Sequence, residues 1–352
     1  MWRSILIIAL LLGIMACSDD EDEFAPGQAP SADFNIDQRS IEVGKTITFE
    51  DRSQNDPTEW TWHISDEDTM TYEAQNPEVT FEEEGVYDIQ LKVSNREGSD
   101  EKIREDHILV SEDPPEEVKE ENNSLINKYT ATWCRPCGTW GWDFFEEVVM
   151  EDLDEKVLMT LYATRGEEHL YSEDAAELAG LFEAPSGTPT FMVNGEIEDT
   201  EGQNVSEVYS NLEANMKETI NEQQGEEATV NSTSGHSVED NILSVTVETR
   251  FFSDVENGYD LSVFLVEHDV QAFQEPRSEH GSEADHKYVA RKALNEEGIL
   301  TPLTEDGAEA GERIFHHFET DIPEEWNERN FKIVTMAFER GTFDVDLVNA
   351  SW

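Results

Sequence analysis

Two cysteines separated by two residues are the part of this sequence best suited to chemistry. Cys134 and Cys137 follow an apolar segment and precede an amphipathic one, so the pair is expected between a strand and a helix. In that setting a thiolate at the first position attacks a disulfide, and the second thiol releases the product. The chain holds 3 cysteines, and the remaining one, Cys17, adjoins an N-terminal apolar run. The sequence therefore predicts a dithiol–disulfide site at residues 134–137.

The residues around the pair suit thiol chemistry. A cysteine at the start of a helix has its thiolate stabilised by free backbone amides and the helix dipole, which lowers the thiol pKa. Arg135 adds a positive charge beside Cys134, and Pro136 fits the first helical turn because no N–H is needed there. Trp133 is expected to flank the sulfur and limit its exposure. We therefore expect Cys134 to attack and Cys137 to resolve.

Other roles for the cysteine pair remain open on the sequence alone. A structural or vestigial disulfide is one, since cysteine pairs in exported proteins oxidise readily. A metal site is disfavoured, because no second Cys-x-x-Cys and no nearby pair of histidines accompanies the cysteines. His280 and His286 lie in an acidic loop with Glu283 and Asp285, where chance spacing explains them better than metal binding. No metal and no cofactor is therefore expected.

The segment around the cysteines reads as alternating strands and helices. Over residues 125–221 the apolar patterns follow the order β-α-β-α-β-β-α, which predicts a mixed sheet covered by helices. Together with Gly187-Thr188-Pro189-Thr190 before an apolar hairpin, this order resembles thioredoxin. The resemblance implies an α/β thioredoxin-like domain at 124–222, with Pro189 in a cis peptide and the backbone of Thr188 free to pair with an extended substrate.

One position departs from that resemblance. Thioredoxins usually carry a buried acid six residues before the first cysteine, and Lys128 stands there in this chain. A lysine that points inward would favour the thiolate over the thiol, whereas a lysine can also snorkel outward. Gly138 and Gly141, together with the bulky Trp140 and Trp142, also predict an irregular start of the helix.

The N-terminus predicts export and a lipid anchor. Residues 1–16 combine a short basic start with an apolar run too short to span a membrane, which indicates a signal peptide. Cys17 follows an aliphatic-x-small triplet that resembles a bacterial lipobox, which implies cleavage before Cys17 and lipid attachment to its sulfur. The acidic tether at 17–30 resembles the surface-export signal of some outer-membrane lipoproteins, and a merely solvated tether is the other interpretation. We expect an outer-membrane lipoprotein at the cell surface or on the periplasmic face.

The charge of the chain excludes several classes of partner. Lys and Arg number 23 against 81 Asp and Glu, for a net charge of −58. Nucleic acid is excluded as a natural partner because clusters of Lys and Arg that could neutralise phosphates are absent. Anionic headgroups are repelled as well, so membrane attachment must come from lipid. Self-repulsion predicts a halophilic protein that melts at higher temperature as salt rises, and calcium loops of the Asp-x-Asp-x-Asp-Gly type are absent from the sequence.

Residues 31–111 read as one small all-β unit. Alternating apolar and polar runs between turn-forming clusters predict strands at Ile41–Phe49, Trp60–Ile64, Glu78–Phe81, Val86–Val93 and Lys102–Val110. With Ala32-Asp33-Phe34 and Gly85-Val86-Tyr87, the unit resembles the polycystic-kidney-disease (PKD) domain. The resemblance implies an extracellular immunoglobulin-like sandwich that acts as a spacer or adhesion module, with a glycan or protein ligand left open. Trp60 and Trp62 share one sheet face, where core packing is favoured over stacking on carbohydrate.

The rest of the chain predicts a linker and a third domain. Tandem prolines among acids make residues 112–123 an extended linker. Residues 223–352 return to alternating strands, which predicts a C-terminal all-β sandwich, interrupted by a long irregular excursion at 271–306. The arrangement resembles the outer-membrane-protein-28-related lipoproteins, which join a thioredoxin-like domain to a β-rich C-terminal domain. The motifs that carry this resemblance are Thr130-Ala131-Thr132-Trp133-Cys134, Thr188-Pro189-Thr190, His286-Lys287-Tyr288-Val289-Ala290-Arg291 and Leu347-Val348-Asn349-Ala350.

These features predict a multidomain lipoprotein that performs thiol–disulfide exchange. Its partners would be the thiols and disulfides of extracytoplasmic proteins, together with the outer membrane that holds the lipid anchor. The alternative from another class is a surface-binding or scaffold lipoprotein without enzymatic activity, in which the cysteine pair is a structural or vestigial disulfide.

Overall fold

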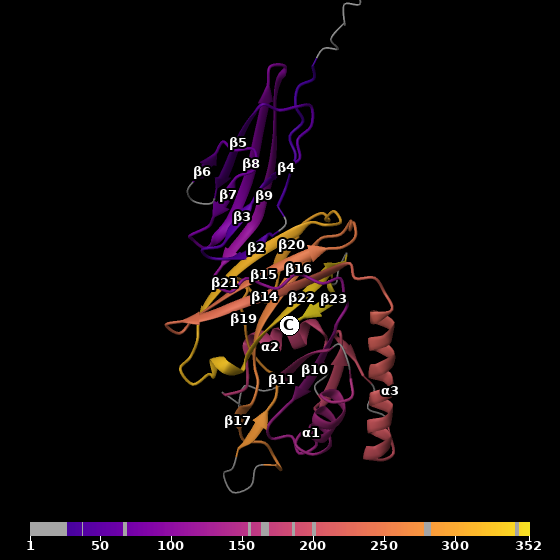
Figure 1. Ribbon diagram of the computed structural model, residues 1–352. Helices are drawn as coiled ribbons and strands as arrows, with labels where there is room; N and C mark the ends of the chain where they lie inside the picture. The colour runs from indigo at the N-terminus through magenta and orange to yellow at the C-terminus, as the bar shows by residue number, and fades with distance from the viewer. Residues whose placement is uncertain are drawn as a thin grey trace, which may run out of the picture.

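The computed structural model describes residues 27–36, 38–65, 69–153, 156–162, 169–184, 187–198, 202–277, 283–341 and 345–352. The predicted signal peptide, Cys17 and most of the acidic tether lie outside the described residues, as does His280. The chain is multidomain and mostly β, with a sandwich at one end and larger sheets with few helices below it (Figure 1). Within the described part of the chain, every helix is too short or too polar to cross a membrane.

The N-terminal sandwich is built from short strands around one apolar core. One sheet has the order β2-β9-β8-β5-β6, and two small sheets pair β1 with β4 and β3 with β7. The strands are β1 (Phe34–Asn35), β2 (Ser40–Glu42), β3 (Thr46–Thr48), β4 (Glu50–Asp51), β5 (Glu59–Ser65), β6 (Thr69–Tyr72), β7 (Glu78–Thr80), β8 (Gly85–Asn95) and β9 (Gly98–Ser111). Their alternating burial follows the pleat, because successive side chains point to opposite faces of a strand.

The two tryptophans of β5 belong to this core. Trp62 is fully buried, and its ring meets those of Phe34 and Phe49 edge-on, with centroids 5.4 Å apart in each pair. Trp60 is partly buried against the same core, and its indole N–H donates to Asp51 at 2.7 Å. Both rings are thus committed to packing, as expected, rather than presented as an open platform for carbohydrate.

A large sheet runs through the remainder of the molecule in the order β13-β12-β10-β11-β19-β16-β22-β23, with β20 also paired to β16. Its strands are β10 (Ser124–Thr130), β11 (Lys156–Tyr162), β12 (Thr190–Val193), β13 (Glu196–Ile197), β16 (Tyr259–Glu267), β19 (Val289–Ala293), β20 (Thr301–Thr304), β22 (Phe331–Arg340) and β23 (Val345–Ser351). The sheet is mixed, because β10 runs parallel to β11 and antiparallel to β12.

A further sheet packs on the C-terminal half of this large sheet. It comprises β14 (Val230–Glu239), β15 (Ile242–Phe251) and β21 (Arg313–Asp321) in the order β14-β15-β21. Val245 and Val247 on β15 share an apolar core with Leu261 and Val263 on β16, and all four are fully buried. A small hairpin, β17 (Val270–Ala272) with β18 (Ala284–His286), projects from these strands toward the end of the molecule opposite the N-terminal sandwich (Figure 1).

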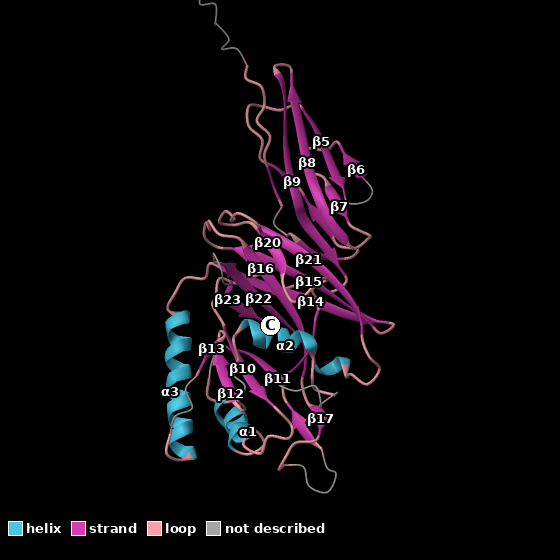
Figure 2. Ribbon diagram, turned by 180° about the vertical axis from the view of Figure 1, so that it is seen from behind, coloured by secondary structure: helices cyan, strands magenta, loops and turns pink. Residues whose placement is uncertain are grey.

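The helices lie around the β10–β12 part of the large sheet (Figure 2). They are α1 (Trp140–Phe144), which continues as a π-helical turn (Phe145–Val149), α2 (Glu173–Leu181) and α3 (Val205–Gln224), with a short 3-10 turn at Glu328–Asn330. The side chains of Ser172 and Asn204 cap α2 and α3 by accepting backbone N–H groups of the first turn. Phe144 and Phe145 bury the inner face of the α1 region against β12.

Strand β11 joins the part of the chain that carries the cysteines to the C-terminal strands. It pairs in parallel with β19 at Thr160 and Val289. The backbone N–H of Thr160 donates to Tyr288 O at 2.6 Å, and its hydroxyl donates to Lys287 O at 2.7 Å. Residues 124–162 and 259–351 therefore share one continuous sheet rather than two separate ones.

The linker is fixed to the C-terminal strands by Asn349. The side chain of Asn349 on β23 donates to Glu121 O at 2.9 Å and to Val230 O at 2.8 Å, and its carbonyl accepts the N–H of Asn123 at 3.0 Å. Asn349 is 1% exposed, so these bonds are shielded from water. The last residues of the linker are thereby fastened between β14 and β23.

The junction between the N-terminal sandwich and the sheet below it concentrates positive charge. Arg313 on β21 contacts Glu248 on β15 at 2.9 Å, and both side chains are largely buried. Arg104 on β9 lies 3.5 Å from the ring of His107, which is 5% exposed. Burial, with added repulsion from Arg39, Arg104 and Arg313, lowers the pKa of His107 to about 3. The ring is therefore neutral in the folded protein near pH 7.

We expect His107→Gln to make folding less sensitive to acid. Between pH 7 and pH 5 the histidine of the unfolded chain, with a pKa near 6.5, becomes protonated. The same histidine in the folded protein stays neutral down to about pH 3. The free energy of unfolding therefore decreases as the pH is lowered from 7 to 5, by about 2 kcal/mol from this residue alone. Urea unfolding followed by tryptophan fluorescence at both pH values should show that loss shrink by a similar amount in the variant. An equal loss in both proteins would contradict the assignment.

Candidate functional site

The cysteines lie in a turn between β10 and α1, where they form a disulfide with Cα atoms 5.2 Å apart. Cys134 is 4% exposed and Cys137 is fully buried, so Cys134 is the more accessible sulfur. The N–H of Cys134 donates to Ala131 O at 3.2 Å, and Cys134 O accepts the N–H of Gly138 at 3.2 Å. Regular α-helix starts only at Trp140, so the cysteines precede it in a series of turns rather than forming its first turn.

The predicted proline segment lies directly against the disulfide. The Thr188–Pro189 peptide is cis, as the resemblance to thioredoxin implies, and Cys134 Sγ lies 3.5 Å from Thr188 O. A Cβ on Gly141 would lie 2.6 Å from Pro189 Cγ. The glycine that disturbs the helix start therefore allows α1 to approach the buried proline closely.

The remaining predicted residues lie on the outer side of the turn. Trp133 is 59% exposed, so the side chain leaves much of its surface to solvent. Arg135 and Pro136 are exposed, and the Arg135 guanidinium lies 3.6 Å from the Glu275 carboxylate. The positive charge beside Cys134 is thus partly balanced by an acid from the turn after β17.

Lys128 points inward. It is 5% exposed on β10, and its ammonium lies 4.9 Å from the ring centroids of both Trp142 and Phe145. Burial lowers the pKa of Lys128 to about 7, while the Glu146 carboxylate raises this pKa and the Arg277 guanidinium lowers it. The two rings belong to the helical segment that follows the cysteines, and their electron-rich faces favour the charged form. Lys128 is therefore a buried basic group that changes its charge near pH 7, and it lies beneath the helical segment that follows the cysteines.

A buried histidine lies beside Lys128, and sequence reasoning did not assign it a role. His286 on β18 is 1% exposed; its Nδ1 is bonded to the Tyr162 hydroxyl and its Nε2 lies 3.2 Å from Ala272 O. Burial, with a contribution from the charge of Lys128, lowers the pKa of His286 to about 4. The neutral ring therefore donates through Nε2 and accepts through Nδ1.

The acidic loop near His286 is predicted not to bind a metal ion. Asp285 and His286 are neighbours on β18 and so point to opposite faces. Over the ranges that the structure describes, no group of three or more His, Cys, Asp or Glu side chains is arranged to hold a metal ion. His286 is instead committed to Tyr162 and the Ala272 backbone.

A second element that sequence reasoning missed is the segment after β17. Gln274 reaches from the C-terminal strands into the cysteine turn, with its amide nitrogen 3.2 Å from Thr132 O and 3.3 Å from Cys134 O. The sequence predicted an irregular excursion at 271–306, whereas the structure forms β18, β19 and β20 within it. A single glutamine there carries no local signal of this contact, because 143 residues separate it from Ala131, whose carbonyl it also approaches.

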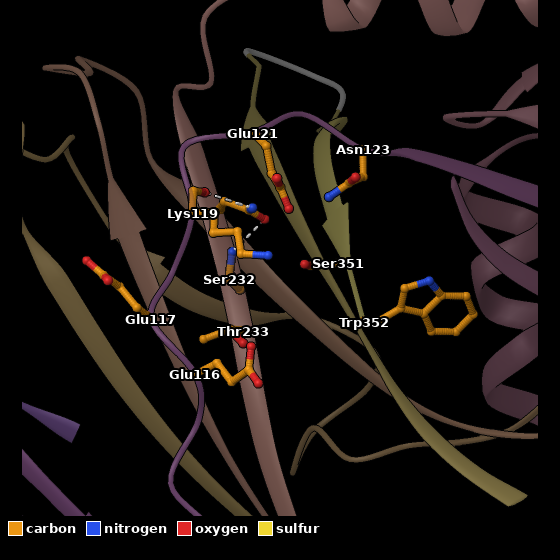
Figure 3. Close-up of a pocket in the computed structure, with 10 residues that line it drawn as sticks. Glu116, Glu117, Lys119, Glu121, Asn123, Ser232, Thr233, Ser351 and Trp352 are labelled. Atoms are coloured by element: carbon orange, nitrogen blue, oxygen red, sulfur yellow. Dashed lines mark hydrogen bonds between the residues drawn. The ribbon is translucent and has the colours of Figure 1, made fainter. Parts of the chain in front are cut away.

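A cavity of about 220 Å³ lies far from the disulfide, between the linker and the strands β14 and β23 (Figure 3). It is lined by Glu116, Glu117, Lys119, Glu121, Asn123, Asn231, Ser232, Thr233, Ser351 and Trp352. Asn231 closes part of it by donating to Lys119 O at 3.1 Å. The lining is mainly polar and acidic and contains no cysteine, so this cavity is separate from the disulfide.

Comparison with known proteins identifies one part of the chain by family. A PKD domain model matches residues 27–110, which confirms the predicted PKD domain. A search of curated proteins finds no match to the chain.

Two solved structures illustrate what the chain is similar to. HBP35 of Porphyromonas gingivalis has 11% identity and a TM-score of 0.51, over 67% of this chain and 76% of that chain. A domain of the outer membrane lipoprotein Omp28 from the same organism has 15% identity and a TM-score of 0.23, over 35% of this chain and 85% of that chain. The chain therefore contains a PKD domain, and over about two thirds of its length it shares a distant fold likeness with HBP35.

Proposed function

We propose that the protein is an extracytoplasmic thiol–disulfide oxidoreductase whose residues 124–222 form a thioredoxin-like unit. The observation that carries this proposal is the disulfide beside a cis proline, with Cys134 Sγ 3.5 Å from Thr188 O. The β-α-β-α-β-β-α order of β10, α1, β11, α2, β12, β13 and α3 supports it. The C-terminal all-β sandwich, 223–352, extends the sheet of this unit through β19.

The exchange step uses Cys134 as the reacting sulfur. A substrate thiolate attacks Cys134 Sγ, the bond to Cys137 breaks, and Cys137 leaves as a thiolate that takes up a proton. A second substrate thiolate then attacks the substrate sulfur of the mixed disulfide and releases Cys134. The substrate gains a disulfide, and its two electrons remain on the two cysteines. In the reverse direction Cys134 attacks a substrate disulfide and Cys137 resolves it, while the backbone at Thr188 pairs with the extended substrate.

The N-terminal residues support a location outside the cytosol. Cleavage before Cys17 and lipid attachment to its sulfur would anchor the protein in the outer membrane, at the cell surface or on the periplasmic face. The tether and the PKD domain then hold the exchange site away from the bilayer, since β10 and α1 lie at the end opposite the PKD domain (Figure 1). The proposed partners are the thiols and disulfides of extracytoplasmic proteins, with a glycan or protein as a further ligand of the PKD domain.

The alternative is a surface-binding or scaffold lipoprotein with a structural disulfide. It is favoured by the low exposure of both cysteines, 4% for Cys134 and 0% for Cys137, because a buried disulfide is poorly accessible to large substrates. In this alternative the PKD domain and the C-terminal strands bind the ligand and the cysteines only fasten the turn.

The reduction potential of the pair separates the two functions. For an exchange enzyme we expect a potential above about −300 mV, together with catalysis of insulin reduction by dithiothreitol; a structural bridge lies below that value. The potential is measured by equilibration of the purified ectodomain with glutathione, and the thiol pKa of Cys134 by the pH dependence of its alkylation.

Two cysteine variants test the assigned roles. Cys134→Ser should abolish insulin reduction, whereas Cys137→Ser should retain attack and accumulate a mixed disulfide with the substrate. The mixed disulfide is detected by non-reducing electrophoresis. Exchange activity that survives Cys134→Ser would exclude this residue as the nucleophile.

Lys128→Met should lower the reduction potential and raise the stability of the fold. The buried ammonium favours the thiolates of the reduced pair, so its loss favours the disulfide. Folding depresses the lysine pKa from 10.5 to about 7, so wild-type stability rises as pH increases through that window. The depressed pKa corresponds to about 4 kcal/mol of penalty at pH 7. Loss of the ring contacts offsets part of it, leaving a net gain of about 2 kcal/mol in the variant.

Urea unfolding at pH 7 and pH 9.5 measures this effect, with Lys156→Met as the control. Lys156 is only partly buried and donates to the Met150 carbonyl at 2.8 Å. Wild type and the control should gain stability between the two pH values, and Lys128→Met should not. The same gain in Lys128→Met would show that this lysine is protonated alike in the folded and unfolded chains.

A further inference from the structure

Gln274 ties the C-terminal strands to the cysteine turn. It is 1% exposed, and its amide nitrogen lies 3.2 Å, 3.3 Å and 3.4 Å from the carbonyl oxygens of Thr132, Cys134 and Ala131. The same nitrogen lies 2.9 Å from the carbonyl oxygen of Glu275, so four carbonyls share the two hydrogens of the amide group. The carbonyl oxygens of Thr132, Cys134 and Ala131 each also accept a backbone N–H, from Glu275, Gly138 and Cys134 respectively, so the Gln274 amide is a second donor to each of them.

The backbone of Glu275 contacts both ends of the cysteine turn. The N–H of Glu275 donates to Thr132 O at 2.8 Å, before the first cysteine. Beyond the second cysteine, a Cβ on Gly138 would collide with the carbonyl oxygen of Glu275. Residues 274–275 therefore contact the chain on each side of the disulfide. Position 138 must be glycine because the carbonyl of Glu275 leaves no room for a Cβ.

Two ion pairs reinforce the contact at its rim. Glu275 lies 3.6 Å from Arg135, and Arg277 is paired with Asp143 and stacks 5.2 Å from the ring centroid of Trp142. These groups are partly exposed, so each pair contributes little by itself. Their arrangement shows that the segment follows the turn and the start of α1 as one complementary surface.

We propose that Gln274 is a positioning residue for the cysteine pair, so that the exchange site is assembled from the cysteine turn and the C-terminal excursion together. This inference rests on the exchange function proposed above. Gln274 donates to the backbone carbonyls of the turn, so it acts through the geometry of the turn.

A turn that is held at three carbonyls keeps the two sulfurs close after the disulfide opens. Sulfurs held close have a high effective concentration toward each other, which favours the disulfide and speeds the resolving attack of Cys137. Removal of the amide donor should therefore make the pair easier to reduce and should lengthen the lifetime of mixed disulfides.

Gln274→Met keeps the length of the side chain and removes its donor. With glutathione we expect the dithiol–disulfide equilibrium to shift about tenfold toward the dithiol, a rise of about 30 mV in potential. Mixed disulfides formed with glutathione should decay about tenfold more slowly. Gln271→Met is the matched control, because Gln271 is exposed on β17 of the same hairpin and bonds only to Asp285 in the described residues. It should change neither quantity.

Gly138→Ala tests the same contact by a change in the cysteine turn, and it replaces Gln274→Met if that variant fails to fold. Its added Cβ should displace the Glu275 carbonyl and shift the equilibrium in the same direction. If a folded Gln274→Met or Gly138→Ala matches wild type within twofold in both measurements, the positioning role is wrong. If the equilibrium shifts while wild-type protein fails to reduce insulin, the positioning role stands and the exchange function fails.

Discussion

The parallel pairing of β11 with β19 is the contact on which the remaining arrangement depends. The two strands meet at Thr160 and Val289, where the hydroxyl and N–H of Thr160 both donate to the chain before β19. A buried strand cannot leave its backbone groups unpaired, so β11 needs a neighbour on that side. The C-terminal strands supply that neighbour, and by doing so they carry the β17–β18 hairpin to the cysteines. One edge contact thereby determines both the continuity of the sheet and the composition of the candidate site.

The features that the sequence predicted are those whose signal is local. The Cys-x-x-Cys spacing and the Thr188–Pro189 dipeptide are contiguous motifs, and alternating runs such as Val86–Val93 follow the pleat of a half-buried strand. The PKD domain was recognised for the same reason, since its motifs succeed one another within 31–111. The contact of Gln274 with the cysteine turn bridges 143 residues, and no periodicity or turn motif encodes such a distance.

Lys128 illustrates a different limit. Strand β10 is buried on both faces, so its pattern does not distinguish an inward lysine from one that snorkels outward. The rings of Trp142 and Phe145 decide the outcome, because they offer the ammonium two π faces inside the core. The protein thus combines a net charge of −58 with buried cationic groups, at Lys128 and at the arginine junction beside His107. The composition gives the net charge but does not reveal the buried cationic groups.

The fastening of the linker by Asn349 has a consequence for the order of folding. Ribosomal synthesis delivers a chain from its N-terminus, and domains made of local contacts fold first. The N-terminal sandwich satisfies that condition, whereas β11 waits for β19 and the linker waits for Asn349. Long sequence separations of this kind slow folding, since loops must close before their contacts form. The cysteines therefore emerge well before the segment that holds their turn, so their disulfide can form before the site around them is complete.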